Sequence, residues 1–188
     1  MMKLYKRAYY KLLDIRRKAN FFFRRLRYKF HPDIHIGRNV EIGRNVKIEI
    51  LFGGEINIGN NTEILDGCRI WSYGGNIKIG NNCSINPYTV IYGNGGATIG
   101  NDVLIAAHSM IVPANHIYSN PETPIRKQGM SEKGIIIEND VWISHGCTII
   151  DGVCIGMGSI IGAGSVVNRN VPANTVFAGI PAQQIKKR

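Results

Sequence analysis

The sequence lacks any long apolar run, holds only four cysteines, and is only 19% charged. No segment approaches the roughly 18 apolar residues of a membrane-spanning helix. The phenylalanine triplet at 21–23 is far too short for the apolar core of a signal peptide. The cysteines show no zinc-type spacing, and Cys68, Cys83 and Cys147 are expected to be buried free thiols. These absences favour a cytoplasmic protein.

Acidic residues are almost absent from the N-terminus, which carries the whole net charge of +10. Residues 1–30 hold 11 Lys or Arg against the single carboxylate of Asp14, whereas the rest of the chain balances 12 basic with 12 acidic groups. A basic chain can bind nucleic acid, but no recognition motif accompanies this charge. We therefore expect no nucleic-acid partner.

An aliphatic residue recurs every six positions from residue 36 onward, in groups of three, so that one coil takes about 18 residues. The repeated positions are Ile36, Ile42, Ile48, Ile58, Ile64, Ile70, Ile79, Ile85, Ile91, Ile99, Ile105, Ile111, Ile137, Ile143, Ile149, Ile155, Ile161, Val167 and Ala173. This period predicts an all-β solenoid, a triangular parallel β-helix whose aliphatic side chains fill the interior. Gly and Asn suit its tight corners.

Longer returns between the first coils all fall at one corner. They contain the glycine pairs Gly53–Gly54, Gly74–Gly75 and Gly95–Gly96, which are 21 residues apart. The same interval next reaches His116, where an extended polar loop begins that we place at 116–134. A loop this long in a regular solenoid is usually functional, which makes His116 the first catalytic candidate.

The hexapeptide repeat resembles the left-handed β-helix family of acyltransferases over residues 36 to about 185. The segments "PANHIYSNPETPIRKQG", "IIIENDVWISHGCTIIDGV", "IGAGSVV" and "VPANTVFAGIPAQQI" resemble the xenobiotic and sugar O-acetyltransferase branch. The resemblance implies left-handed coils, against the usual crossover preference. It also implies a homotrimer that binds acetyl-CoA in a groove between neighbouring subunits and needs no metal.

Matching positions in that branch imply roles for individual residues. His116 takes the place of the general base. The positions expected to bind the acceptor are Asn86, Trp142 and His145. The positions expected to line the acetyl-CoA groove or to meet its phosphates are Ala106, Ser144, Ala163, Arg169 and Lys186, with Lys187 and Arg188 beside them.

The chemistry of acetyl transfer fits these residue types. A sugar hydroxyl is a weak nucleophile, and a neutral imidazole can accept its proton as it attacks the thioester carbonyl. Backbone N–H groups near Ser144 or His145 are expected to hold the developing oxyanion. Glu122 and a backbone carbonyl both remain candidates for orienting His116.

Residues 1–30 are expected to form a basic amphipathic helical segment that precedes a β-helix domain at 31–188 with a C-terminal tail. The apolar stripe comprises Ala8, Leu12, Ile15, Ala19, Phe22 and Leu26. Two roles stay open, and they are compatible. The segment can lie on anionic lipid at the inner face of the membrane, or it can cap the open first coil.

These features predict a CoA-dependent O-acetyltransferase that acts on a sugar hydroxyl, in bacterial surface polysaccharide biosynthesis. Three alternatives stay open: an antibiotic acetyltransferase of the streptogramin or chloramphenicol type, a zinc enzyme resembling γ-carbonic anhydrase, and a non-catalytic scaffold. The zinc enzyme needs three converging histidines, and His108, His116 and His145 lack that close spacing. His108 is expected to be structural, and His31 and His35 to be surface groups.

Overall fold

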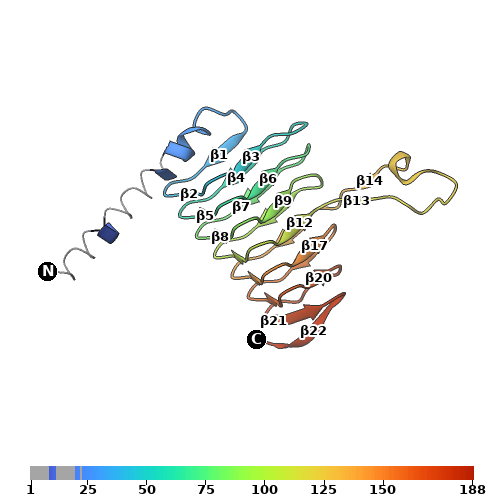
Figure 1. Cartoon of the computed structure of the whole chain (residues 1–188). Helices are drawn as coiled ribbons and strands as arrows, with labels where there is room; N and C mark the ends of the chain where they lie inside the picture. Colours follow the sequence, from blue (N-terminus) through green and yellow to red (C-terminus); the bar gives the residue numbers. More distant parts are fainter. Residues whose placement is uncertain (1–8, 12–19, 22) are drawn as a thin grey trace.

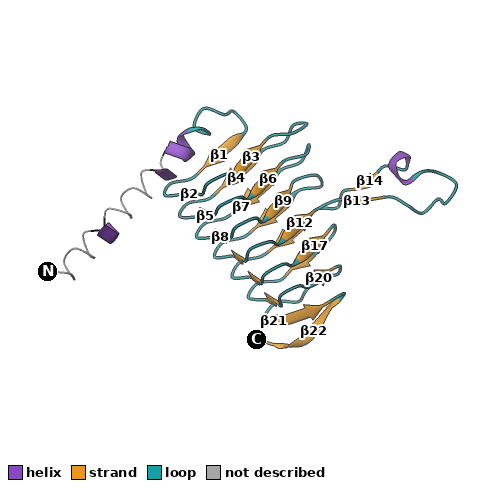
Figure 2. Ribbon diagram, in the orientation of Figure 1, coloured by secondary structure: helices purple, strands orange, loops and turns teal. Residues whose placement is uncertain are grey.

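The computed structural model describes residues 9–11, 20–21 and 23–188. From residue 34 the chain winds into a left-handed parallel β-helix of about six turns, as predicted (Figure 1). Its three walls are parallel sheets, which we call A, B and C in the order in which each coil visits them (Figure 2). The edges where the chain passes between walls are the A–B, B–C and C–A corners.

Each wall takes one short strand from every coil. Sheet A contains β1 (Ile34–Ile36), β4 (Ile56–Ile58), β7 (Ile77–Ile79), β10 (Ala97–Ile99), β15 (Ile135–Ile137) and β18 (Cys154–Ile155). Sheet B contains β2 (Glu41–Ile42), β5 (Glu63–Ile64), β8 (Ser84–Ile85), β11 (Leu104–Ile105), β16 (Trp142–Ile143), β19 (Ile160–Ile161), β21 (Thr175–Gly179) and β22 (Ala182–Lys187). Sheet C contains β3 (Lys47–Glu49), β6 (Arg69–Trp71), β9 (Val90–Tyr92), β12 (Met110–Val112), β17 (Thr148–Ile150) and β20 (Val166–Val167).

The interior is filled by the aliphatic positions of the repeat. Side chains alternate along each strand, so that in β7 the buried Ile77 and Ile79 flank the exposed Lys78. The repeated positions are buried as predicted, except Ile36, which is half-buried, and Ala173, which is exposed. The prediction for Ala173 was wrong because the last coil is shorter. Val171 bridges Ile155 there and takes the interior position.

Asparagines form a ladder along the A–B corner. The Asn60 backbone N–H donates to Asn81 Oδ1 at 2.8 Å, the Asn81 N–H to Asn101 Oδ1 at 2.8 Å, and the Asn101 N–H to Asn139 Oδ1 at 2.7 Å. The residue after each rung has a positive φ, which Asn and Asp tolerate better than other side chains. The sequence triplets "GNN" and "GND" thus close this corner in the second, third and fourth coils.

The longer returns emerge at the C–A corner, as predicted, and the longest of them is an arm. It spans residues 113–134 and begins ahead of the predicted His116 because β12 ends at Val112. Strands β13 (Asn115–His116) and β14 (Met130–Ser131) pair antiparallel at its base. The 3₁₀ turn η1 (Ile125–Lys127) lies near its tip. The arm projects well clear of the prism (Figure 1).

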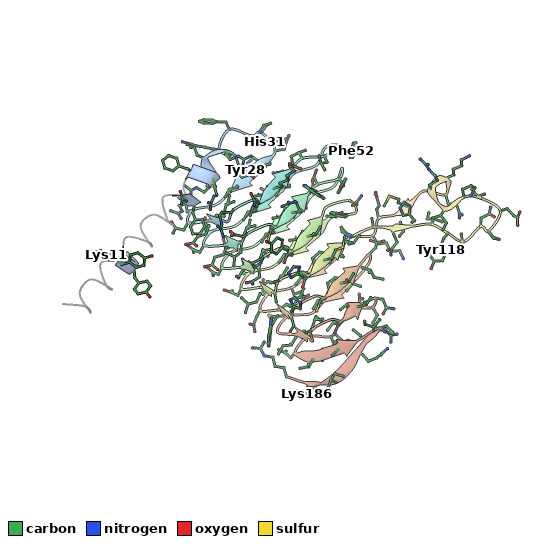
Figure 3. All side chains as sticks on the ribbon, in the orientation of Figure 1. Lys11, Tyr28, His31, Phe52, Tyr118 and Lys186 are labelled. Atoms are coloured by element: carbon green, nitrogen blue, oxygen red, sulfur yellow. The ribbon has the colours of Figure 1, made fainter. Side chains whose placement is uncertain are left out.

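Both ends of the solenoid are covered. At the first coil, Tyr28 is buried, Arg24 donates to the Ile42 carbonyl at 3.2 Å, and Arg25 donates to the Gly37 carbonyl at 3.4 Å. These contacts favour capping, and Figure 3 shows Tyr28 against the first coil. At the last coil, the predicted tail is instead the strand β22, which pairs antiparallel with β21.

Most of the predicted apolar stripe lies outside the described residues, and its one described member, Leu26, is exposed. Within the described part of the chain, no helix has the length and apolar character needed to cross a bilayer.

Candidate functional site

Three predicted residues stack at the B–C corner. Asn86, Ala106 and Ser144 occupy the same position in successive coils, directly after β8, β11 and β16. Each backbone N–H donates to a sheet B carbonyl of the next coil, at 2.8 to 2.9 Å. Because the side chains of Ala106 and Ser144 are small, an extended ligand can approach the backbone along this edge. We call the edge formed by Asn86, Ala106 and Ser144 the Asn86 strip.

Asn86 offers a fixed polar group at the start of that strip. Its Nδ2 donates to the Ile105 carbonyl at 3.0 Å, which holds the amide in one orientation. The Oδ1 atom has no hydrogen-bond partner among the described residues, and the side chain is half-buried. It can therefore accept a hydrogen bond from a ligand hydroxyl.

His145, one residue beyond Ser144, belongs to a column of rings along the same corner. The rings of Tyr88 and His108 stack with centroids 5.2 Å apart and planes at 16°. His145 meets His108 edge-on at 5.5 Å. Sequence reasoning assigned His145 to the acceptor but overlooked Tyr88 and treated His108 as structural. All three side chains are exposed beside the Asn86 strip.

A sequence signal for the two overlooked residues does exist. Tyr88 and His108 occupy a corner position that requires a left-handed backbone, with φ of 61° at both. The other coils place glycine or asparagine there: Asn45, Gly67, Gly146 and Gly164. Tyrosine is uncommon in this conformation, which histidine tolerates better, and such outliers gather at functional sites. Aligning the corners of successive coils would have singled them out.

Trp142 lies on the outer face of sheet B, two residues before Ser144, and is 48% exposed. It lines a cavity of about 170 Å³ together with Leu104, Ile160, Asp140 and Arg188. The Arg188 guanidinium is already paired with Asp140 at 2.8 Å and with the Gly158 carbonyl at 2.9 Å. That pairing competes with the phosphate contact expected of Arg188.

The remaining cofactor candidates are spread over two edges. Ala163 is exposed at the B–C corner, in the position equivalent to His145. Lys186 is exposed on β22, opposite Val176. Arg169 lies in the return after β20, at the C–A corner, within 3.4 Å of Gln183. Within one chain, Arg169 is therefore not beside the Asn86 strip.

His116 is exposed on the arm, where β13 pairs it with Met130. Its imidazole makes no hydrogen bond within the described part of the chain. The Glu122 backbone N–H donates to Asn120 Oδ1 at 2.9 Å, and the Glu122 carboxylate makes no contact that would orient His116. Because the arm leaves the C–A corner, the width of sheet C separates His116 from the Asn86 strip (Figure 1).

Two backbone N–H groups, those of Ser144 and His145, were expected to hold the oxyanion, and they differ in whether they already donate a hydrogen bond. The Ser144 N–H donates to the Ile161 carbonyl at 2.9 Å, so it is not free to donate to an oxyanion in this structure. The N–H of His145 has no partner among the described residues. Of the two donors considered, His145 is the one that can serve a ligand.

The thiols and histidines of the described residues form no group that could hold a metal. All four cysteines are free, and burial raises the pKa of Cys68 to about 11. In the described ranges, His, Cys, Asp and Glu side chains nowhere gather in a group of three or more that could hold a metal. His116 lies across sheet C from His108 and His145, so the three histidines of a zinc site do not converge within one chain.

Comparisons with known proteins identify the repeat. The family described as bacterial transferase hexapeptide (six repeats) matches residues 134–169. The putative lipopolysaccharide biosynthesis O-acetyl transferase WbbJ of Escherichia coli K12 is 36% identical over 142 residues, 71% of this chain and 72% of that protein. Galactoside O-acetyltransferase of the same organism is 40% identical over 104 residues, 55% of this chain and 46% of that enzyme.

A solved structure shares the architecture over most of the chain. AntD, an N-acyltransferase from Bacillus cereus in complex with dTDP-4-amino-4,6-dideoxyglucose and coenzyme A, aligns with a TM-score of 0.72 and 29% identity. The alignment covers 82% of this chain and 83% of that one. The repeat, the left-handed prism and these relatives agree, and the chain belongs to the hexapeptide-repeat acyltransferase family.

Proposed function

We propose that this protein transfers an acetyl group from acetyl-CoA to a hydroxyl of a sugar acceptor, in the synthesis of a bacterial surface polysaccharide. The observation that carries the proposal is the pairing of two features. An exposed histidine stands on a projecting arm, and a strip of small residues next to a fixed amide runs along the B–C corner. The similarity to WbbJ supports the sugar acceptor and the pathway.

The active site is shared between subunits of a homotrimer. His116 and the Asn86 strip lie on different edges of one prism, so a complete site needs the arm of one copy and the B–C corner of another. The wall between those edges is suited to self-association, because the outward-facing residues of sheet C in coils three to six are mostly apolar and half-buried. The aliphatic side chains and methionine among them are Val90, Met110, Val112, Ile150 and Val166.

The reaction follows from these positions. His116 accepts the proton of the acceptor hydroxyl while that oxygen attacks the thioester carbonyl carbon. The His145 N–H stabilises the resulting oxyanion, a contribution of roughly 3 kcal/mol in comparable acyl transfers. The carbon–sulfur bond then breaks, and the imidazolium of His116 returns the proton to the departing thiolate of CoA. Asn86 Oδ1 holds a second hydroxyl of the sugar.

The other candidate residues bind acetyl-CoA or the acceptor and take no part in the proton transfers. Ala106, Ser144 and Ala163 let the pantetheine arm approach the backbone. Arg169 and Lys186 attract the phosphates of CoA. Trp142 and its cavity contact the substrate where the strip joins sheet B.

The N-terminal segment extends this function to the membrane. We propose that residues 1–30 form a unit distinct from the β-helix of 31–188 and hold the enzyme at the inner, cytoplasmic face of the membrane. The exposed Phe30 and Leu26, next to Arg25, Arg27 and Lys29, suit an anionic lipid surface. Capping of the first coil by Tyr28 is compatible with this contact.

One experiment tests the reaction and the acceptor atom together. Thiol release from acetyl-CoA is followed with a panel of sugars, nucleotide sugars, amino sugars and chloramphenicol, and each product is then treated with mild alkali. An alkali-labile product from a hydroxyl sugar is expected, since esters hydrolyse and amides do not. The AntD acceptor carries an amine, so an alkali-stable product limited to amino sugars would replace O-acetylation by N-acetylation. Turnover of chloramphenicol alone would support an antibiotic enzyme.

A further inference from the structure

Four aromatic side chains gather at the C–A corner of the first three coils, outside the site described above. We call Phe52, Trp71, Tyr73 and Tyr92 the aromatic shelf. Tyr73 meets Tyr92 at 4.9 Å and Trp71 at 5.9 Å, both edge-on, and Trp71 stacks on Tyr92 at 5.9 Å. Phe52 stacks on Tyr73 at 6.3 Å and extends the shelf toward the first coil.

The two outermost rings are held in an unfavourable way. Phe52 and Tyr73 each precede a glycine pair at the tip of a return, with φ of 61° and 44°. Bulky side chains rarely adopt this conformation. Phe52 is also 89% exposed, and Figure 3 shows it at the tip of its turn. Neither a left-handed backbone at these residues nor an exposed aromatic ring stabilises the fold by itself. Both features therefore point to a ligand that contacts the rings.

Trp71 provides a second, independent observation. Its Nε1 is the one buried side-chain nitrogen or oxygen of the described residues without a hydrogen-bond partner. Buried indole N–H groups usually find an acceptor. The shelf therefore holds an unused donor among its rings, next to the Tyr73 and Tyr92 phenols.

The shelf is continuous with the arm that carries His116. Only the return at 93–96 separates the Tyr73 turn from the root of the arm, and the Gly95 N–H donates to the Pro113 carbonyl at 3.1 Å. Adjacent coils are about 4.8 Å apart, so Phe52 and the arm root, three coils apart, are separated by roughly 14 Å along this edge. That span exceeds a single sugar ring.

We propose that the aromatic shelf binds the non-reacting sugar units of an oligosaccharide acceptor. This inference rests on the proposed function and names the acceptor as a glycan chain rather than a single sugar. Aromatic faces pack against the apolar C–H faces of pyranose rings, and the Tyr73 and Tyr92 phenols bind their hydroxyls. The returns at 51–55 and 72–76 contain no Lys or Arg and include Glu55, so an anionic membrane is a poor fit.

The test compares single sugars with their linear oligomers as acceptors. Glucose, galactose, N-acetylglucosamine and sialic acid, each with its oligomers, are assayed with the wild type, Phe52→Asn and Tyr73→Asn. Asparagine tolerates the left-handed backbone, so both variants should fold. Ile136→Asn is the matched control, because Ile136 is also exposed and apolar but lies on sheet A.

The wild type should prefer oligomers in kcat/KM, and each shelf variant should reduce that preference about tenfold while single-sugar turnover stays unchanged. Ile136→Asn should keep the preference. Saturation-transfer NMR with the oligomers alone should show binding that Phe52→Asn weakens, and this readout does not depend on acetyl transfer. If oligomers bind but no sugar is acetylated, the proposed function fails and the shelf stands. An unchanged preference and unchanged binding would overturn the shelf, as would a loss of trimer mass in Phe52→Asn, which would make it a subunit contact.

Discussion

Two variants of this protein that are each inactive should regain activity when their subunits assemble into the same trimer. His116→Ala removes the proposed base from the arm, and Asn86→Ala combined with His145→Pro, which removes the backbone N–H proposed for the oxyanion, disables the B–C corner. Pro87 holds the same corner position as His145 in an earlier coil, so proline fits there. The structure places these groups on two edges separated by sheet C. A complete site in the proposed trimer therefore takes the arm of one copy and the corner of its neighbour, so the two defects can be separated into different sites.

The size of the recovery follows from counting. Purification through both tags keeps only mixed trimers, and in either 2:1 arrangement about a third of the sites pair an intact arm with an intact corner. The mixed trimers should show about a third of the wild-type rate, although each variant alone is nearly inactive. Co-expression with two different affinity tags, sequential purification and an acceptor-dependent thiol-release assay would measure it. If mixed trimers stay at the level of the separate variants, the shared site is refuted.

Three further predictions concern the fold. Gly75→Ala should lower the free energy of unfolding by about 3 kcal/mol, because the added Cβ would overlap carbonyl oxygens of the next return. Gly53→Ala meets nothing within 4 Å and should cost only about 1 kcal/mol, from its φ of 93°; equal shifts in urea denaturation would contradict this. Tyr28→Ala should lower the free energy of unfolding by about 3 kcal/mol if residues 23–31 cap the first coil, and an unchanged urea midpoint would count against the cap. Burial raises the pKa of Cys68 to about 11 and also raises that of Cys154, which is only half-buried. At pH 8 the native protein should react slowly with a disulfide reagent, first at Cys154 and faster as the pH rises, and rapid labelling of several thiols would oppose it.

The repeat made the fold readable from the sequence. A six-residue period places an aliphatic side chain on every wall of a triangular prism, and Ile85 and Ile143 are fully buried as that period requires. The extrapolation failed at Ala173, where the final coil shortens and Val171 fills the interior. The spacing of the repeat in the earlier coils does not reveal that the final coil is shorter.

The candidate site was less accessible to sequence reasoning. Asn86 and Ser144 could be aligned on one corner because the repeat sets their spacing. Aligning the corners would single out Tyr88 and His108, but the stacking of their rings depends on side-chain orientations that the repeat does not encode. The separation of His116 from that corner depends on the edge at which the arm leaves the prism. Whether the two groups meet in one site depends in turn on how the subunits pack.

The most direct test of this account is acceptor-dependent thiol release by His116→Ala, measured beside the wild type and His31→Ala. His31 is an exposed histidine near the first coil, remote from the arm, and serves as the matched control. With the best sugar acceptor, His116→Ala should lose kcat by a factor of about 10² or more with little change in the KM for acetyl-CoA, and His31→Ala should match the wild type. Full activity in His116→Ala would contradict the central claim and remove this histidine from the chemistry.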